Sequence, residues 1–186
     1  YSKVEYLANG LKYNAIEAKH IVFCEGFGLH ANPYFNDLPL DGTKGELLII
    51  KAPELKLQAI VKSNIFILPI GNDLYKVGAT YNWEDKTNLP TANGKKELLQ
   101  NLEELIACDY EVVAHFAGVR PTVKDRRPLV GTHYVHKQLH ILNGLGTRGV
   151  MLGPFLAKQL FEYLENESAL DKEIDINRFY KKRGLL

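Results

Sequence analysis

Six residues near the end of the chain, Gly144 to Gly149, have a glycine spacing that is typical of cofactor-binding turns. Their sequence is Gly-Leu-Gly-Thr-Arg-Gly, which fits the pattern G-x-G-x-x-G. An apolar, strand-like run at 139–142 precedes the motif, and a helix-like run at 150–164 follows it. In dinucleotide-binding turns of this kind, glycines let the backbone approach a phosphate at the start of a helix. The local context therefore favours a turn that binds a cofactor.

The place of the motif in the chain argues against a phosphate-binding role. Only 37 residues follow Gly149, and they contain no second strand that could carry an acidic residue for a ribose hydroxyl. A glycine turn that leads into a helix can instead present backbone N–H groups and the positive helix end to a cofactor ring. An ordinary tight turn, with glycines that serve its geometry alone, is the alternative.

Other residue patterns give weaker chemical signals. His133 and His136 have the spacing of a metal pair, but no cysteine or carboxylate lies at a suitable spacing, so we expect surface histidines and no metal site. No Ser/His/Asp arrangement stands out. Basic residues cluster at 124–127 and 181–183, where a solvated face is the prediction and a phosphate-bearing partner is the minor alternative.

Composition and length limit the class of protein. The 186 residues allow one large domain or two small ones, and the net charge of +1 argues against a dedicated binder of nucleic acid or membrane surfaces. No apolar run approaches the roughly 20 residues that span a bilayer. Cys24 and Cys108 form no disulfide-type pattern, which favours a reducing, cytoplasmic setting. The chain begins at Tyr1 without a signal-peptide pattern, so we interpret it as a fragment of a longer protein.

The two ends of the sequence predict pieces of one α/β layer. Val4 to Ile16 predicts a hairpin around a type I′ turn at Asn9-Gly10. His20 to Cys24 predicts a buried, parallel strand that opens into a glycine turn at 25–28, where ligands gather in open α/β sheets. The remaining elements expected at this end of the sequence are a loop at 119–131, a strand at 139–142, a helix at 150–164 and a short helix at 174–183.

The middle of the sequence predicts an inserted antiparallel sheet with one helix. The elements expected there are strands at 46–50, 57–61, 65–69, 74–80 and 110–116, and a helix at 92–107. We therefore predict a mixed α+β and α/β fold, with an antiparallel-sheet domain at 31–116 inserted into the remaining part of an α/β domain. That α/β domain comprises residues 1–30 and 117–170, and 171–186 forms a C-terminal tail.

Five stretches, in order and at matching spacing along most of residues 12–165, resemble flavin-dependent amine oxidases of the D-amino-acid oxidase and glycine oxidase family. IVFCEG at 21–26 is similar to the last strand of that family's FAD-binding domain. GVRPTVKDRRPLVG at 118–131 resembles its G-x-R-P…D-G-x-P-x-I-G loop, and LHILNGLGTRGVMLGP at 139–154 resembles its closing strand, glycine turn and helix. GTKGE at 42–46 and VGAT at 77–80 look like two of its strands.

The resemblance implies an FAD-dependent oxidoreductase that oxidises a C–N bond of an amino acid or secondary amine by hydride transfer to flavin. Residues 1–30 and 117–170 would be the remnant of its FAD-binding domain, and 31–116 its substrate domain. In this family the phosphate-binding G-x-G-x-x-G lies at the N-terminus of the full protein. We therefore expect FAD in the full-length parent, and a fragment that is inactive and lacks the cofactor.

The resemblance also implies which residues contact the flavin. Backbone N–H groups at 145–150 would point at the pyrimidine edge of the ring, and the positive helix end would stabilise negative charge there. The cofactor-binding residues implied are Gly26, Phe27, Gly144, Leu145, Gly146, Thr147, Arg148, Gly149 and Val150.

Three residues are the implied substrate contacts. The guanidinium of Arg120 matches a family arginine that pairs with the substrate carboxylate, although a structural ion pair with Asp125 or a bond to a backbone carbonyl stays open. Arg148 either reaches the same carboxylate or faces solvent. Phe66 stands where glycine oxidases carry a tyrosine, and Arg126 replaces a loop glycine, so the exact substrate is open. No catalytic residue is assigned, because a flavin needs little acid–base help.

Other functions remain alternatives at this stage. The same fold could act on a 2-hydroxy acid or on a modified tRNA base, and the tRNA function would need a basic surface that the near-neutral charge does not support. A non-catalytic binding module is an alternative of a different class. The expected partner is a small-molecule amine or amino acid, with no nucleic acid and no membrane span, and the oligomeric state is open.

Overall fold

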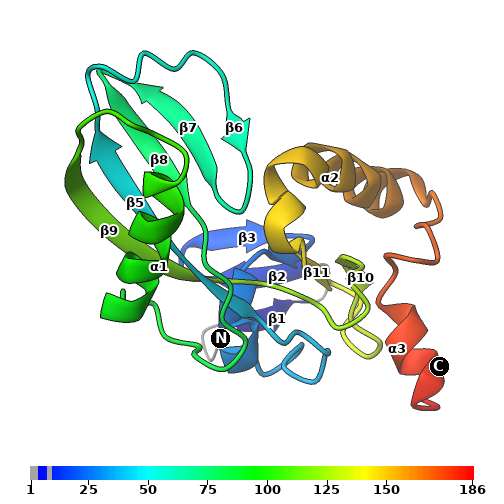
Figure 1. Ribbon diagram of the computed structural model, residues 1–186. Helices are drawn as coiled ribbons and strands as arrows, with labels where there is room; N and C mark the ends of the chain where they lie inside the picture. The colour runs from blue at the N-terminus through cyan, green and yellow to red at the C-terminus, as the bar shows by residue number, and fades with distance from the viewer. Residues whose placement is uncertain (1–3, 8–9) are drawn as a thin grey trace. The chain divides into compact units, whose positions relative to one another are not determined.

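The computed structural model describes residues 4–7 and 10–186, which fall into two compact units (Figure 1). The first unit comprises residues 1–42 and 120–186, and the second comprises 43–119. The boundaries differ from those expected, because residues 31–42 and the tail at 171–186 belong to the first unit. Side chains of both segments, such as Phe35 and Tyr180, lie in the same buried cluster. Each unit is described by itself.

A three-stranded antiparallel sheet opens the first unit. Its strands, in the spatial order β1-β2-β3, are β1 (Val4–Leu7), β2 (Gly10–Tyr13) and β3 (Ile16–Ala18). Gly10 pairs with Leu7 as the first residue of β2, so it does not lie in the expected Asn9-Gly10 turn, and Asn9 lies outside the described residues. A Cβ on Gly10 would lie 2.6 Å from the Ala18 carbonyl oxygen, so glycine permits the close approach of β3.

The second sheet of the first unit contains the strand that precedes the glycine turn. Its strands are β4 (Ile21–Phe23), β10 (Leu129–Thr132) and β11 (Leu139–Asn143), in the order β10-β11-β4. The parallel pairing expected for the first strand is confirmed, since β4 runs parallel to β11. The prediction that this strand is buried was wrong. Val22 is 39% exposed, because β4 is the edge strand of the described sheet.

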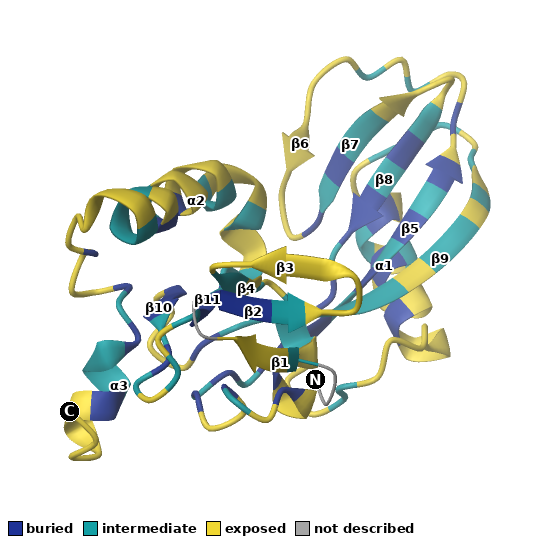
Figure 2. Cartoon of the chain, turned by 180° about the vertical axis from the view of Figure 1, so that it is seen from behind, coloured by how far each residue is buried: buried dark blue, intermediate teal, exposed yellow. Residues whose placement is uncertain are grey.

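Two helices and two short 3₁₀ segments complete the first unit. They are η1 (Gly26–Ala31), η2 (Gly146–Arg148), α2 (Gly149–Asn166) and α3 (Asn177–Lys182). Leu156 and Leu160 of α2 pack in one buried cluster with Val130 of β10. Other positions of α2 carry exposed apolar residues, among them Phe155 and Phe161. Figure 2 shows that much of the helix surface is exposed.

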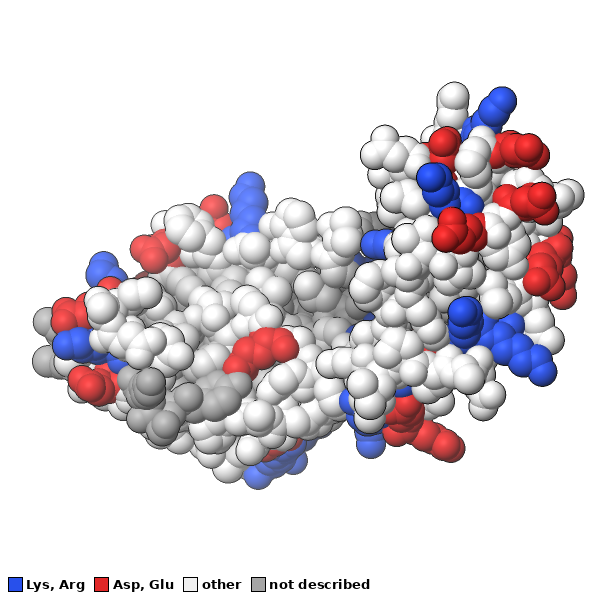
Figure 3. All heavy atoms as spheres, turned by 90° about the vertical axis from the view of Figure 1, so that its left-hand side faces the viewer, with Lys and Arg blue, Asp and Glu red and all other residues white. Residues whose placement is uncertain are grey.

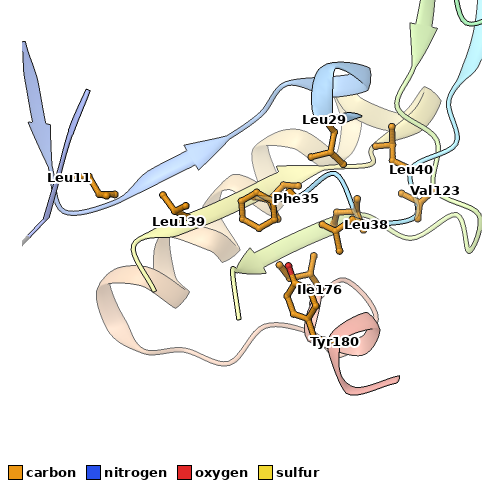
Figure 4. Close-up of a cluster of buried hydrophobic side chains, with 11 residues drawn as sticks. Leu11, Leu29, Phe35, Leu38, Leu40, Val123, Leu139, Ile176 and Tyr180 are labelled. Atoms are coloured by element: carbon orange, nitrogen blue, oxygen red, sulfur yellow. The ribbon is translucent and has the colours of Figure 1, made fainter. Parts of the chain in front are cut away.

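The main core of the first unit joins distant parts of the chain. Figure 4 shows side chains from β2, η1, β11 and α3 in one cluster. Its fully buried members are Leu11, Leu29, Phe35, Leu38, Leu40, Val123, Leu129, Leu139, Ile141, Ile176 and Tyr180. Val123 and Leu129 come from the segment expected to be a plain loop, which is in fact shorter: β9 extends to Arg120 before it, and β10 begins at Leu129 after it.

The second unit is a five-stranded sheet with one helix. The elements are β5 (Thr43–Lys51), β6 (Val61–Lys62), β7 (Phe66–Gly71), β8 (Leu74–Gly78), α1 (Ala92–Glu103) and β9 (Glu111–Arg120). The strand order is β6-β7-β8-β5-β9, so β5, the first strand in sequence, lies between β8 and β9. Of the strand expected at 57–61 only its end forms, since β6 begins at Val61; a turn at 52–55 precedes this segment, and Lys56 has φ +44°.

Alternation along the strands gives this sheet one fully buried face. Leu48, Ile50 and Val77 are buried in one cluster with Leu98 and Leu102 of α1. Their neighbours in sequence, such as Leu47 and Ile49, point to the opposite face and are only partly buried. The mixed α+β class predicted from the sequence is confirmed.

Candidate functional site

The ends of β4 and β11 come together at the predicted cofactor turn. The two strands pair in register, with Ile141 opposite Phe23, so their carboxyl ends lie at the same edge of the sheet. Asn143, which is 3% exposed, donates from Nδ2 to the carbonyl oxygen of Gly26 at 2.9 Å. Its Oδ1 accepts a hydrogen bond from the N–H of Gly144 at 2.8 Å. One buried amide thus fixes two of the predicted cofactor segments to each other.

The backbone of the glycine turn needs its glycines. Gly144 and Gly146 have φ of +73° and +55°, in the left-handed region that glycine favours. A Cβ on Gly144 would lie 2.5 Å from Cγ2 of Val123, so the turn packs against the 121–128 segment without room for a side chain. The N–H of Gly146 donates to the carbonyl oxygen of Pro121 at 3.0 Å. The turn is therefore seated on the loop that follows Arg120.

The start of α2 offers hydrogen-bond donors beside apolar side chains. Among the described residues, no side chain caps the helix at Arg148, so the first N–H groups of α2 have no side-chain acceptor there. Val150 is 99% exposed and Met151 is 69% exposed. The helix end is electropositive, and exposed apolar surface adjoins it. This combination suits a flat ring whose rim accepts hydrogen bonds and carries negative charge.

Arg120 is the last residue of β9 and is partly buried. It directly precedes Pro121, whose carbonyl oxygen holds the glycine turn, so Arg120 is joined in sequence to the seat of that turn. The ion pair with Asp125 that the sequence left open for Arg120 is made by Arg178, whose Nε lies 3.1 Å from Asp125 Oδ2. Pairing of Arg120 with a substrate carboxylate stays a prediction.

Arg148 and Phe66 have clear structural partners. Arg148 is exposed, and its Nη2 donates to the backbone carbonyl oxygen of Arg126 at 2.8 Å, which ties the glycine turn to the loop a second time. Phe66 belongs to the second unit and pairs with Gly78 across β7 and β8. A Cβ on Gly78 would lie 3.2 Å from the Phe66 ring, so the glycine makes room for the aromatic side chain. Substrate contacts for both residues stay predictions.

The remaining predicted cofactor residues lie at the same edge. Gly26 has φ +59° and opens η1, and the partly buried Phe27 packs against the main core. Thr147 is exposed in the middle of η2. The structure therefore brings the predicted cofactor residues from both strand ends together, within the first unit.

A buried charged cluster in the second unit was not foreseen. Lys44 and Glu46 occupy the same face of β5, with side chains 1% and 5% exposed. Lys44 Nζ donates to Asp85 and to the carbonyl oxygen of Leu89, both at 2.5 Å. These bonds fix the loop after β8. The hydrogen bond from Lys44 lowers the pKa of Asp85 to about 2.

Glu46 holds the start of α1. Its carboxylate accepts from the N–H and the hydroxyl of Thr91 at 2.8 Å each, and His115 Nε2 lies 2.8 Å from it. A Cβ on Gly94 would lie 2.5 Å from the carboxylate carbon, so only glycine allows this approach. The only sequence signal was the spacing of Lys44 and Glu46, which alternation places on one face of a strand.

Histidines in the first unit form a second unforeseen feature. His140 is 2% exposed; its Nε2 lies 2.9 Å from His20 Nδ1, and its Nδ1 lies 2.8 Å from the Thr132 hydroxyl. Burial, with His20 adding to it, lowers the pKa of His140 to about 4. The chain of contacts continues to Tyr163 on α2, since the two hydroxyls are 3.0 Å apart. It fastens α2 to the sheet.

Of the histidine pair singled out in the sequence, His133 is buried and His136 is partly exposed. His133 is 6% exposed, and its Nδ1 accepts from the N–H groups of Val135 and His136. The expectation of a surface histidine was therefore wrong for His133, because its ring caps a turn against Phe35 and Tyr180. Within residues 4–7 and 10–186, no group of three or more His, Cys, Asp or Glu side chains is arranged to hold a metal ion.

Comparison with known proteins decides the family. The family described as "FAD dependent oxidoreductase" matches residues 2–163. The chain belongs to this family. Its FAD-dependent members include the glycine oxidase of Geobacillus kaustophilus, which is 29% identical over 133 residues, covering 69% of this chain and 35% of the relative. A tRNA 5-methylaminomethyl-2-thiouridine biosynthesis bifunctional protein from Idiomarina loihiensis is 25% identical over 138 residues, covering 71% of this chain and 22% of the relative.

Solved structures share the fold of this FAD-dependent oxidoreductase family member. The G. kaustophilus glycine oxidase superposes with a TM-score of 0.73 at 24% identity, over 91% of this chain and 49% of that one. The iminodiacetate oxidase of Chelativorans sp. BNC1 gives a TM-score of 0.76 at 21% identity, over 92% and 51%. The chain spans about half the length of these two solved structures. It spans a smaller share, 35% and 22%, of the two curated relatives named above. Among the described helices, none is long and apolar enough to cross a membrane.

Proposed function

We propose that this chain is the C-terminal part of an FAD-dependent oxidoreductase that oxidises a C–N bond of a small amino acid or secondary amine. The observation that carries the proposal is the corner where β4, β11 and α2 meet. There a buried Asn143 ties Gly26 to the glycine turn, and the adjoining helix has no side-chain cap. Family membership supplies the cofactor, and the relatives named as glycine and iminodiacetate oxidases supply the substrate class.

Three features of the corner fit a flavin ring. The left-handed glycines let the turn pack closely on its loop, the start of α2 offers N–H donors, and Val150 and Met151 provide an apolar border. Gly26, Phe27 and residues 144–150 would hold the ring. When bound, FAD supplies the acceptor for the hydride from the carbon that bears the amine.

The protein side of the reaction is binding and orientation. Arg120 would pair its guanidinium with the substrate carboxylate, which fixes the amine-bearing carbon relative to the ring. Arg148, whose guanidinium already donates to the carbonyl oxygen of Arg126, would be a secondary contact. Phe66 would be a substrate contact that is more apolar than a tyrosine. The product imine would then hydrolyse to a keto or aldehyde compound. No described residue is needed as a general base for this step.

A modified tRNA base is the second candidate substrate, because a relative that is similar over 71% of this chain is named for tRNA modification. Charge argues for the small substrate. The net charge is +1, and acidic and basic side chains are interspersed on the face drawn in Figure 3. We also propose a reducing, cytoplasmic setting, which the two free cysteines support, and a small-molecule rather than a nucleic-acid partner.

The test is to express the protein together with any N-terminal region encoded in its gene and to record its visible spectrum. We expect a yellow flavoprotein that is bleached anaerobically by glycine, sarcosine or iminodiacetate. Arg120→Gln should raise KM for these carboxylates by about 100-fold or more, while a carboxylate-free amine loses little, because the lost bond joins two charges. A colourless protein, or one bleached only by 2-hydroxy acids or modified tRNA, would overturn the proposal.

A further inference from the structure

One arginine in the C-terminal segment binds five acceptors at once. Arg178 Nη1 donates to the carbonyl oxygens of Ile174 and Asp175 at 2.8 and 3.0 Å, and Nε donates to Asp125 Oδ2 at 3.1 Å. Its Nη2 donates to the carbonyl oxygens of Arg127 and Pro128 at 3.4 and 3.0 Å. The side chain is 15% exposed. A planar guanidinium can serve all these directions together, whereas a lysine cannot.

The loop that Arg178 holds is the seat of the glycine turn. Its Pro121 carbonyl oxygen accepts from the N–H of Gly146, and its Arg126 carbonyl oxygen accepts from Arg148 Nη2. Val123 packs against Gly144 so closely that no Cβ fits between them. Arg178 therefore fastens one side of the loop at 121–128, and the glycine turn rests on the other side.

The first half of the loop is anchored separately, because the carbonyl oxygen of Thr122 accepts from the N–H groups of Asp41 and Gly42 and the side chain of Val123 is buried. The second half, at 125–128, is the part that Arg178 contacts. Arg126 stands at φ +59°, a conformation that a non-glycine residue holds only when its surroundings impose it. Asp125 Oδ1 accepts from the N–H of Arg127 at 3.0 Å, so the aspartate that bonds Arg178 also shapes the loop. Without the guanidinium, this carboxylate and two adjoining carbonyl oxygens would face each other without a cation.

The segment that carries Arg178 lies beyond the family match, which ends at residue 163. It is nevertheless built into the first unit. Val130 of β10 donates to the carbonyl oxygen of Ile174 at 3.0 Å and accepts from the N–H of Ile176 at 2.9 Å. The side chain of Ile176 is fully buried. The segment is a fixed platform from which Arg178 can hold the loop.

We propose that Arg178 is a positioning residue for the flavin corner. It acts through the loop at 121–128 to hold the glycine turn and the start of α2 in the geometry that binds the ring. This inference rests on the proposed function, because its purpose is to shape a flavin site. Its structural half, the coupling of Arg178 to residues 144–150, is independent of the cofactor.

The experiment compares Arg178→Ala and Arg178→Lys with a matched control, Arg127→Ala. The control breaks the exposed ion pair of Arg127 with Glu173, which joins the same two segments. The first measurement is amide hydrogen exchange of residues 144–150 in the purified protein without added FAD. We expect about tenfold or faster exchange in both Arg178 variants, because several bonds to a charged group are lost, and less than a twofold change in the control.

The second measurement is FAD affinity, followed by the shift of the flavin absorption bands. We expect about tenfold weaker binding in Arg178→Lys and an altered band position, with neither change in Arg127→Ala. Should Arg178→Ala fail to fold, Arg178→Lys decides alone. Unchanged exchange at 144–150 with faster exchange only at 171–183 would overturn the inference. If neither the wild type nor the variants bind FAD, the proposed function is wrong, and so is the part of the inference that concerns the flavin. Faster exchange at 144–150 in the Arg178 variants would then support only the coupling of Arg178 to the glycine turn.

Discussion

The glycine turn can be tested by adding one methyl group at Gly144. At φ +73°, alanine carries a conformational cost of about 1–2 kcal/mol. Its Cβ would lie 2.5 Å from Val123 Cγ2 and 3.1 Å from Leu129 Cγ, which adds an overpacking cost of about 1–3 kcal/mol. Gly144→Ala should therefore lower the free energy of unfolding by about 2–5 kcal/mol. Urea titration measures this loss as a shift of the midpoint at constant slope.

Gly26 offers a matched control at the neighbouring strand end. It has φ +59°, but a Cβ there would meet nothing within 4 Å. Gly26→Ala should therefore show the conformational cost alone, about 1–2 kcal/mol. The difference between the two variants isolates the close packing of the turn on its loop.

A double variant then identifies the clashing partner. Adding Val123→Ala to Gly144→Ala removes the nearest methyl group, so the two substitutions should couple by about 1 kcal/mol or more. If Gly144→Ala costs no more than Gly26→Ala, or if the coupling is zero, the turn is not seated on Val123 and our description of the site is refuted.

Three further predictions concern the buried polar groups. Burial lowers the pKa of His140 from 6.5 to about 4. The free energy of unfolding should therefore be highest above pH 6.5 and fall by up to about 3 kcal/mol as the pH drops to 4. In urea unfolding, His140→Gln should lose this pH dependence, whereas the exposed His30→Gln should keep it. Because Lys44 lowers the pKa of Asp85 from 3.8 to about 2, the wild-type protein should lose further stability between those values, and Asp85→Asn should flatten that step in acid titration. Gly94→Ala should lower the free energy of unfolding by about 1–3 kcal/mol, because the added Cβ would displace the carboxylate of Glu46. This loss should appear although alanine has the better helix propensity. An unchanged thermal unfolding midpoint would contradict the close contact.

Elements with a strong local pattern were predictable from the sequence. The helical periods predicted both helices: α2 spans Gly149–Asn166, close to the expected 150–164, whereas α1 spans Ala92–Glu103 and ends one turn before the expected residue 107. The apolar run before Glu25 gave a parallel strand, and the G-x-G-x-x-G spacing gave the turn. These elements could be predicted because hydrophobic periodicity and glycine spacing depend only on residues that are close in sequence.

Features made by contacts between distant residues were not predictable. The tail joins the first unit because Ile176 and Tyr180 are buried against residues from four other segments, which no local pattern reports. The burial of Lys44 depends on oxygens more than forty residues away, at Asp85 and Leu89. The sequence shows Arg178 only as one basic residue near the C-terminus, and its contacts with the loop at 125–128 become apparent only in the structure.

The position of the flavin ring is the central claim. The direct measurement is a crystal structure of the FAD-bound protein, and specifically the distances from the backbone nitrogens of residues 145–150 to the pyrimidine edge of the ring. We predict hydrogen-bond distances of about 3 Å for at least one of these nitrogens. A ring placed away from this turn, or a pyrophosphate bound against it, would contradict the account.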